Sequence, residues 1–269
     1  MPDLAGGSGG VSPGADAALL ELDGVSKSFG RVVVADQLSL SVRQGDMVGI
    51  VGPNGAGKSS LFGLIAGDLT ASYGQISFGG ADVTHLNAAA RCRLGIGRTF
   101  QVPKPFGAMT VFENVLVAVQ QGARLRRRLS YATAVDMLEL TGLAADANIP
   151  AERLGLLSRK RLEVAKALAT SPRLLLLDEV AGGLTDPEVA QLVGIVSSIR
   201  SGGVAVIWIE HVVHALTTTV DRLLCLYGGA FIGDGQPEEV LALPAVREVF
   251  LGTEVSASLP VPGGDQESE

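Results

Sequence analysis

Residues Gly52-Pro53-Asn54-Gly55-Ala56-Gly57-Lys58-Ser59 decide the fold of this chain. They match the pattern GxxxxGK(S/T) and lie between a short apolar segment, Met47–Val51, and a segment with helical spacing at residues 61–66. Glycines permit tight turns that bring successive backbone N–H groups to phosphate oxygens, and the positive end of the following helix points at the same charge. In such a loop the lysine reaches the β- and γ-phosphates and the hydroxyl ligates Mg²⁺. The stretch, together with Ser60, therefore predicts a nucleotide-binding loop between a strand and a helix.

A pair of acidic residues supplies the second half of the predicted site. The apolar residues 174–177 have the length of a buried strand, and Asp178 and Glu179 follow them directly. Ligands bind outside the carboxyl ends of the strands in an open parallel sheet. We expect Asp178 to hold Mg²⁺ through water, and Glu179 to orient and deprotonate an attacking water molecule. An ordinary turn at the end of a strand is the alternative interpretation of adjacent Asp and Glu.

The composition excludes several classes of protein. Of the 269 residues, 47% are hydrophobic and 18% are charged, which excludes a mainly disordered chain. The 28 acidic residues outnumber the 21 basic ones and aromatic residues are few, so no nucleic-acid partner is expected. Two cysteines without a CxxC motif exclude a disulfide scaffold and a zinc cluster. Apolar runs fall short of the roughly 18 residues that span a bilayer and no Lys or Arg precedes Lys27, so we expect a cytoplasmic protein without a signal peptide.

The rest of the chain alternates between strand-like and helix-like segments. Residues 1–17 are Gly- and Ser-rich and predict a flexible leader, residues 18–252 predict one large domain, and residues 253–269 predict a flexible acidic tail. The predicted strands are Ala18–Phe29, 32–42, Met47–Val51, 75–78, 174–177, 204–209, 223–227 and 230–232. The predicted helices are 61–66, 111–120, 131–140, one that begins at Asp186-Pro187 and one that opens at Gln236.

Residues 91–161 differ from their surroundings in charge and in pattern. They contain 12 of the 21 basic residues and only 5 of the 28 acidic ones, and their spacing is mostly helical. Thr110 and Glu113 have the spacing of a capping box. The basic run at residues 124–128 is either a solvated helix face or a patch that faces anionic lipid headgroups. We therefore predict an α/β fold: a P-loop NTPase core with a mostly parallel sheet, an N-terminal antiparallel β subdomain and an inserted helical subdomain at about 91–161.

Four motifs in one order together resemble the ATP-binding subunit of an ABC transporter, over about residues 20–252. They are the loop at residues 52–59, Gln101 after Gly97-Arg98-Thr99-Phe100, the strand that ends in Asp178-Glu179, and His211 after Trp208-Ile209-Glu210. Three shorter segments resemble the corresponding segments in ATPase subunits of branched-chain amino acid importers. The relatives of these importers include transporters of urea. The three segments are Arg98-Thr99-Phe100-Gln101, residues 109–115 and Ile209-Glu210-His211.

The resemblance implies a role for several single residues. Gln101 is expected to contact Mg²⁺ and water at the joint with the helical insert and to transmit nucleotide state to the membrane partner. His211 is expected to contact the γ-phosphate and, with Glu179, to form the catalytic pair. Phe29 stands where an aromatic side chain stacks on adenine, with a core or turn aromatic as the alternative. The predicted metal-binding residues are Ser59, Gln101 and Asp178.

The chain departs from the family at the signature that usually reads LSGGQ. The aligned residues are Leu154-Gly155-Leu156-Leu157-Ser158. In the family a Ser hydroxyl and glycine N–H groups at this helix N-terminus face the γ-phosphate bound to the other subunit. Gly155 has no hydroxyl, and Leu156 and Leu157 add bulk where glycines allow close approach. Smaller departures are Val180 in place of a common Pro, and Thr185 in place of a common Asp or Asn.

These observations predict a transport ATPase with ATP and Mg²⁺ as cofactors. The function expected from the resemblance is an ABC importer for branched-chain amino acids or related small solutes, driven by ATP hydrolysis. The expected partners are transmembrane permease subunits, a second ATPase subunit that is nonidentical or a second copy, and indirectly a periplasmic or extracellular solute-binding protein. The chain would then lie on the inner face of the cell membrane. The alternatives are a nucleotide-dependent clamp with little hydrolysis and the ATPase of a lipid or lipopolysaccharide exporter.

Overall fold

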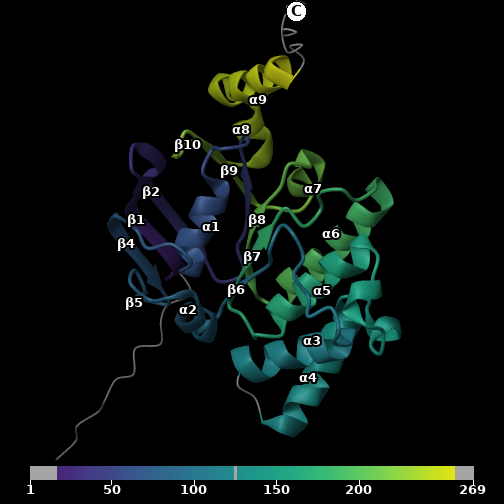
Figure 1. The fold of residues 1–269 in the computed structure, drawn as a ribbon. Helices are drawn as coiled ribbons and strands as arrows, with labels where there is room; N and C mark the ends of the chain where they lie inside the picture. The colour runs from purple at the N-terminus through teal and green to yellow at the C-terminus, as the bar shows by residue number, and fades with distance from the viewer. Residues whose placement is uncertain (1–16, 124–125, 258–269) are drawn as a thin grey trace, which may run out of the picture.

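The larger of two β-sheets carries the phosphate loop. The computed structural model describes residues 17–123 and 126–257, and Figure 1 shows both sheets with helices packed around them. Neighbouring strands of the larger sheet are parallel except for the hairpin that forms one edge, so the predicted mostly parallel sheet is confirmed. In spatial order its strands are β10 (Ala230–Gly235), β9 (Arg222–Tyr227), β3 (Met47–Val51), β8 (Ala205–Ile209), β7 (Leu174–Asp178) and β6 (Ile96–Arg98).

Both faces of this sheet are covered, which explains the continuous apolar runs of its central strands. Every residue of β3, β7 and β8 is buried. Helix α1 (Lys58–Ala66) and the second sheet cover one face, and helices α5 (Leu156–Leu168) and α6 (Asp186–Ser201) cover the other. Because β3, β6, β7 and β8 run in parallel, their carboxyl ends meet at one edge of the sheet.

The second sheet is the predicted N-terminal antiparallel subdomain. Its order is β2 (Val32–Arg43), β1 (Ala18–Phe29), β4 (Tyr73–Phe78) and β5 (Ala81–Asp82). Strand β5 and the helix that follows, α2 (Ala88–Leu94), were not predicted. Arg91 of α2 is fully buried and donates to the carbonyls of Leu64 and Ile65 at the end of α1, at 2.5 and 2.9 Å. This side chain therefore fixes α2 against the helix that follows the phosphate loop.

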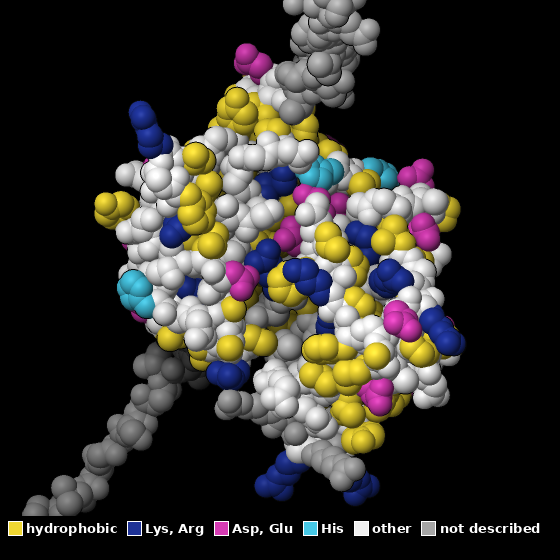
Figure 2. All heavy atoms as spheres, viewed as in Figure 1, with side chains coloured by type: hydrophobic (Ala, Val, Ile, Leu, Met, Phe, Trp, Pro, Cys, Tyr) yellow, Lys and Arg dark blue, Asp and Glu magenta, His cyan; other side chains and the backbone are white. Residues whose placement is uncertain are grey.

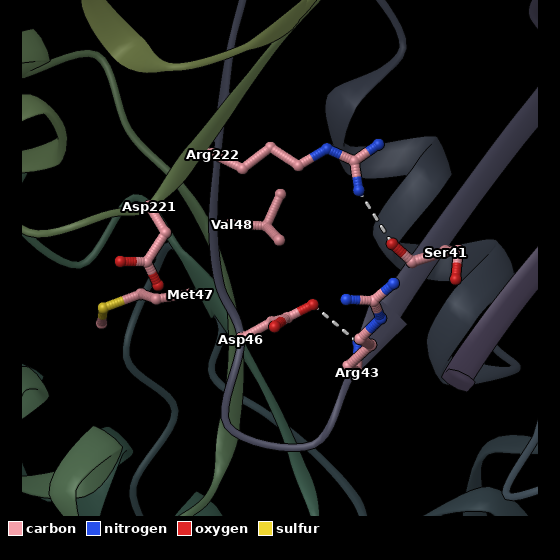
Figure 3. A pocket seen from close by; sticks show the side chains of 7 residues that line it. All are labelled: Ser41, Arg43, Asp46, Met47, Val48, Asp221 and Arg222. Carbon is pink, nitrogen blue, oxygen red and sulfur yellow. Dashed lines mark hydrogen bonds between the residues drawn. The ribbon is translucent and has the colours of Figure 1, made fainter. Parts of the chain in front are cut away.

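Arg222, the first residue of β9, joins the two sheets at the edge opposite the phosphate loop. Its Nη1 donates to the carbonyl of Ser41 in β2 at 2.9 Å, and its guanidinium pairs with Asp234 of β10 at 2.6 Å. A cavity of about 280 Å³ opens beside this joint, and Figure 3 shows Arg222 reaching across it to Ser41 while Asp46 bonds the backbone of Arg43. The link sets the antiparallel subdomain at a fixed position relative to β3.

The helical insert has a core of its own, but it begins later than predicted. Residues 96–98 form β6 of the central sheet, so the predicted start at about residue 91 is wrong, because apolar Ile96 pairs with β7 instead of joining the insert. The insert contains α3 (Val111–Ala118), a π-helical segment (Val119–Ala123), α4 (Arg127–Leu140), two 3₁₀ turns (Ala144–Asp146 and Ala151–Arg153) and the start of α5. Their apolar side chains form a separate cluster.

Two sequence predictions for the insert can be compared with the structure. The capping box is confirmed, since Thr110 Oγ1 accepts from the Glu113 N–H at 3.1 Å and Glu113 Oε2 accepts from the Thr110 N–H at 2.8 Å. Of the basic run, residues 124 and 125 lie outside the described residues, and Arg126 and Arg128 are exposed. Figure 2 shows hydrophobic side chains gathered over α3 and α4, with Lys and Arg side chains at the outer end of this region. Both interpretations of the basic run remain predictions.

The chain continues as helix past the predicted end of the domain. Gln236 precedes α8 (Pro237–Ala242), as predicted, and α9 (Pro244–Ala257) follows at once. The predicted boundary at residue 252 is therefore wrong, because α9 runs through it. The predicted leader, apart from residue 17, and residues 258–269 of the predicted tail lie outside the described residues. None of the helices within 17–123 and 126–257 has the length and apolar character that crossing a bilayer requires.

Candidate functional site

The phosphate loop follows β3 with a backbone that only glycine permits at two positions. Gly52 has φ +153° and Gly57 has φ +107°. A Cβ at Gly52 would lie 2.1 Å from the carbonyl oxygen of Leu226, and one at Gly57 would lie 2.3 Å from that of Val34. Any side chain at either position would push the loop away from β9 or β2. These glycines therefore fix the curvature of the loop between β9 and β2.

Helix α1 begins at the end of this loop with its first N–H groups free of helical partners. The first helical bond runs from the Leu61 N–H to the Gly57 carbonyl at 2.8 Å, so the N–H groups of Lys58, Ser59 and Ser60 precede it. No side chain within the described part of the chain caps this end of the helix. An anion at the loop would thus meet backbone donors, the helix dipole and the Ser59 hydroxyl together.

Lys58 is buried and its ammonium group lies over the loop. Its Nζ donates to the carbonyls of Gly52 at 2.7 Å and Pro53 at 2.9 Å. Burial lowers the pKa of Lys58 from its ordinary value, while the negative charges of Glu179 and Asp178 act in the opposite direction. The cation is therefore held between the loop and the two carboxylates, where the β- and γ-phosphates of a nucleotide would lie.

Asp178, the last residue of β7, is anchored from β6. Its Oδ2 lies 3.0 Å from Nη2 of Arg98, and its N–H donates to Thr99 Oγ1 at 3.0 Å. Burial raises the pKa of Asp178, and the hydrogen bond from Arg98 opposes that shift. Arg98 also pairs with Asp68 at 2.7 Å. Arg98 was not predicted as a site residue, although its place in the motif before Gln101 is a signal for such a role.

Glu179 lies at the centre of the site, and its carboxylate contacts two of the predicted residues. Oε2 accepts a hydrogen bond from Gln101 Nε2, and Oε1 lies 2.7 Å from His211 Nε2. The Glu179 backbone has φ +48°, in the left-handed region, and its N–H donates to the carbonyl of Ile209 at 2.9 Å. The structure thus brings Gln101, Glu179 and His211 together from the ends of three neighbouring strands.

These residues fit a magnesium nucleotide. The uncapped start of α1 and the two constrained glycines form a cradle for phosphate, with Lys58 beside it. Within the described residues there is no cluster of three or more His, Cys, Asp and Glu side chains that could hold a metal by itself. Mg²⁺ at a phosphate loop does not need one, because phosphate and water oxygens complete its oxygen set. Ser59, Asp178 and Gln101 supply hydroxyl, carboxylate and amide oxygens at this edge.

Phe29 lies apart from the catalytic carboxylate, at the end of β1. Its ring is 50% exposed, and Lys27 Nζ lies 5.1 Å from the ring centroid. The ring is therefore not a core side chain; a turn aromatic, the other part of the alternative interpretation, stays open because Gly30 and Arg31 form a turn. An exposed aromatic ring in this place is available for stacking on a base.

The unusual signature lies at the exposed N-terminus of α5. Gly155 is the N-cap residue, and a Cβ added to it would meet no atom within 4 Å. Leu156 is 48% exposed, and its Cδ2 lies near Gly183, 3.5 Å from where a Cβ of that residue would be. The end of this helix therefore presents a leucine side chain outward in the position of the family's glycine.

The fold and this site are those of an ATP-binding cassette, and comparison with known proteins gives the family. A family model described as ABC transporter matches residues 35–182, more than half of the chain. The chain therefore belongs to the ABC transporter family.

Comparison with individual proteins shows which ABC transporter subunits the chain resembles. The chain is 32% identical over 249 residues to LivG of Salmonella typhimurium, a high-affinity branched-chain amino acid transport ATP-binding protein, covering 87% of this chain and 98% of the relative. It is 33% identical over 234 residues to the lipopolysaccharide export system ATP-binding protein LptB of Acidithiobacillus ferridurans, covering 87% and 97%. A crystal structure of the ADP conformation of an ABC transporter cassette matches with a TM-score of 0.80 and 29% identity, over 88% of this chain and 99% of that one. The chain is an ATPase subunit of an ABC transporter, close to the branched-chain amino acid importer ATPases.

Proposed function

We propose that this chain hydrolyses ATP and thereby drives an importer for branched-chain amino acids or related small solutes. The observation that carries the proposal is the Glu179 carboxylate, which contacts Gln101 and His211 beside Lys58. A carboxylate fixed by two neighbours at the end of a buried strand is placed to orient a water molecule and accept its proton. Mg²⁺, held by Ser59, Asp178 and Gln101, would supply charge neutralisation at the β- and γ-phosphates.

Replacement of Glu179 by Gln tests the hydrolytic role. Glu179→Gln keeps the shape and the hydrogen-bonding capacity of the side chain but removes its basicity, so we expect the steady-state rate to fall about 100-fold or more. Binding of a fluorescent ATP analogue should stay within about threefold, since Lys58 and the loop are unchanged. Equal rates for the variant and the original chain would instead support a nucleotide-dependent clamp with little hydrolysis.

The partners and location follow from the same proposal. Transmembrane permease subunits would receive the motion of the helical insert, a solute-binding protein would deliver the solute, and the chain would lie on the inner face of the cell membrane. The similarity to LivG and to BraF of Pseudomonas aeruginosa supports this assembly. We expect affinity purification of the full chain from its native membranes to recover two permease subunits.

A nonidentical second ATPase subunit is part of the proposal. Each ATP in such a dimer lies between the phosphate loop of one subunit and the signature of the other. This chain offers Lys58 and Glu179 at its own loop but Gly155, Leu156 and Leu157 at its signature. The nucleotide on this chain would therefore be hydrolysed, with a complete signature from the partner, while the partner's nucleotide would be hydrolysed poorly.

Lipopolysaccharide export is the second candidate function, favoured by the similarity to LptB. The two candidates differ in what stimulates hydrolysis. In proteoliposomes containing the purified complex, leucine with its solute-binding protein should raise the ATPase rate if the complex is an importer. Stimulation by lipopolysaccharide and not by leucine would favour export.

A further inference from the structure

The turn that follows Glu179 is held by two buried charged side chains that the catalytic scheme does not use. The turn comprises Glu179, Val180 and Ala181. Lys160 comes from α5, and Glu210 comes from the end of β8. Each contacts a different peptide group of the turn, so the catalytic carboxylate is attached to a backbone that is fixed from two other elements.

Lys160 holds the carbonyl of the catalytic residue. Its side chain is only 5% exposed, and Nζ donates to the Glu179 carbonyl oxygen at 3.0 Å. A Cβ at Gly182 would lie 4.0 Å from the same Nζ, so the ammonium group lies against the inner side of the turn. Burial lowers the pKa of Lys160, and the negative charges of Glu210 and then Glu179 oppose that shift.

Glu210 holds the other end of the turn. It is 1% exposed, and its Oε1 accepts from the Ala181 N–H at 2.5 Å and from Trp208 Nε1 at 3.1 Å. Its Oε2 is buried without a hydrogen-bond partner in the described part of the chain. Burial raises the pKa of Glu210, and its hydrogen bonds with the Ala181 N–H and Trp208, together with the charge of Lys160, oppose that shift.

The backbone of Glu179 requires such support. Its φ of +48° lies in the left-handed region, which is unfavourable for any residue with a Cβ. The Ile209 carbonyl binds its N–H and Lys160 binds its carbonyl, so both peptide groups of the strained residue are fixed. Loss of either bond would allow the residue to relax and would move the carboxylate relative to Gln101 and His211.

We propose that Lys160 is a positioning residue for hydrolysis, which fixes the left-handed backbone of Glu179 and thereby the direction of its carboxylate, while Glu210 holds the Ala181 end of the same turn. The proposal rests on the proposed role of Glu179. It also gives a physical link between the two nucleotide sites of a dimer. Helix α5 carries the signature at its exposed end and Lys160 within its second turn. A displacement of this helix by the nucleotide of the partner would therefore act directly on the turn that carries this chain's own catalytic carboxylate.

The test compares Lys160→Met, which removes the donor and the charge, with Lys160→Arg, which keeps both. Arg161→Met on the same helix is the matched control, because Arg161 bonds Gln191 of α6 and lies away from the turn. In the complex purified from native membranes, we expect Lys160→Met to lower kcat about 10- to 100-fold, because a misplaced catalytic group costs this much. KM for MgATP should change less than about twofold, since the phosphate loop is untouched. Lys160→Arg should retain at least about half of the activity, and Arg161→Met should match the original chain.

A second measurement does not depend on hydrolysis. Hydrogen exchange is followed by mass spectrometry on the full chain alone, without nucleotide, in a peptide that spans residues 178–184. We expect about tenfold faster exchange in Lys160→Met and no change in Lys160→Arg or Arg161→Met, because local opening follows the loss of local bonds. Faster exchange with no hydrolysis in any version of the complex would overturn the proposed function and leave the anchoring of the turn intact. Unchanged exchange, an unchanged kcat, or parallel losses in kcat and nucleotide affinity would overturn the positioning role.

Discussion

The two surfaces that this chain would bring to an ATPase dimer differ sharply. Around the phosphate loop, Lys58, Gln101, Asp178, Glu179 and His211 come together from the ends of four strands, and the Glu179 carboxylate contacts both Gln101 and His211. At the N-terminus of α5, Gly155 and Leu156 offer neither a hydroxyl nor the close approach that glycine allows. A full set of catalytic groups at one nucleotide surface therefore does not require a full set at the other. Only the groups that serve this chain's own nucleotide are all present.

The largest expected effect comes from removing the cation of the complete surface. Lys58→Ala removes the ammonium group between loop and carboxylates, and we expect the ATPase rate of the assembled complex to fall about 100-fold. The partner's own site would not compensate, since the signature that serves it is this chain's incomplete one. Arg200→Ala is the control, because Arg200 pairs with Asp221 at the opposite edge of the sheet. Retention of most ATPase activity in Lys58→Ala would show that this chain's signature supports hydrolysis of the partner's ATP. The two nucleotide surfaces would then not differ in activity.

A smaller loss is expected when Glu179 keeps its basicity but loses one contact. His211→Ala removes the group at 2.7 Å from Glu179 Oε1, and we expect kcat to fall about 10-fold or more because the carboxylate is less well placed. The matched control is His214→Ala, three residues further along the chain in α7 and exposed. Equal kcat values for the two histidine variants would argue that His211 takes no part in hydrolysis.

Phe29, which lies apart from the catalytic carboxylate, should contribute to the affinity for ATP and not to the rate of hydrolysis. Phe29→Ala removes the exposed ring at the end of β1, and we expect the Kd for ATP to rise about fivefold, as the loss of about 1 kcal/mol of stacking implies. Tyr73→Ala serves as the control, because Tyr73 is an exposed aromatic of the same sheet. Titration with a fluorescent ATP analogue measures both. A Kd for Phe29→Ala equal to that of the control would place adenine elsewhere.

The smallest effect is expected from repair of the signature. This change tests most directly whether the two nucleotide surfaces differ in activity. The triple change Gly155→Ser, Leu156→Gly and Leu157→Gly supplies the missing hydroxyl and close approach. We expect the ATPase rate of the complex to rise about twofold, since two sites would turn over in place of one. Leu156→Ala with Leu157→Ala is the control, which removes bulk without adding the hydroxyl or the glycines. An unchanged rate in the repaired complex would show that backbone donors at this helix end already suffice.

Much of the fold was predictable because the deciding signals are local. The phosphate loop, the apolar strands around it and the capping box of Thr110 and Glu113 each depend on residues a few positions apart, and the structure contains all of them. The predicted start of the insert and the predicted end of the domain at residue 252 were wrong for a complementary reason. Ile96–Arg98 is too short to show a period, and it becomes a strand only because β7 pairs with it. Helix α9 begins at Pro244, which the sequence pattern did not associate with a further helix.

In the candidate site, too, residues in motifs were predicted from the sequence, and their partners from other elements were not. The phosphate-loop motif and the apolar strand before Asp178 predicted Lys58, Asp178 and Glu179, and the family resemblance added Gln101 and His211. The structure places all five at one edge of the sheet. The sequence patterns did not predict Arg98 as the partner of Asp178, nor Lys160 and Glu210 at the turn after Glu179. Arg98 and Glu210 lie within motifs, but a motif does not reveal their partners, because each of the three residues acts on a residue that is distant in the sequence and near only after the chain folds.

The sequence by itself determined that a glycine-rich loop between a strand and a helix would bind phosphate, because backbone donors, helix dipole and lysine all come from one short segment. It also determined which carboxylates could serve the reaction. Only the tertiary structure decided how the Glu179 carboxylate is aimed, because its direction depends on Gln101, His211 and Lys160. Those side chains reach it from separate elements: the buried Lys160 holds the strained backbone, and the exposed Gln101 and His211 contact the carboxylate itself.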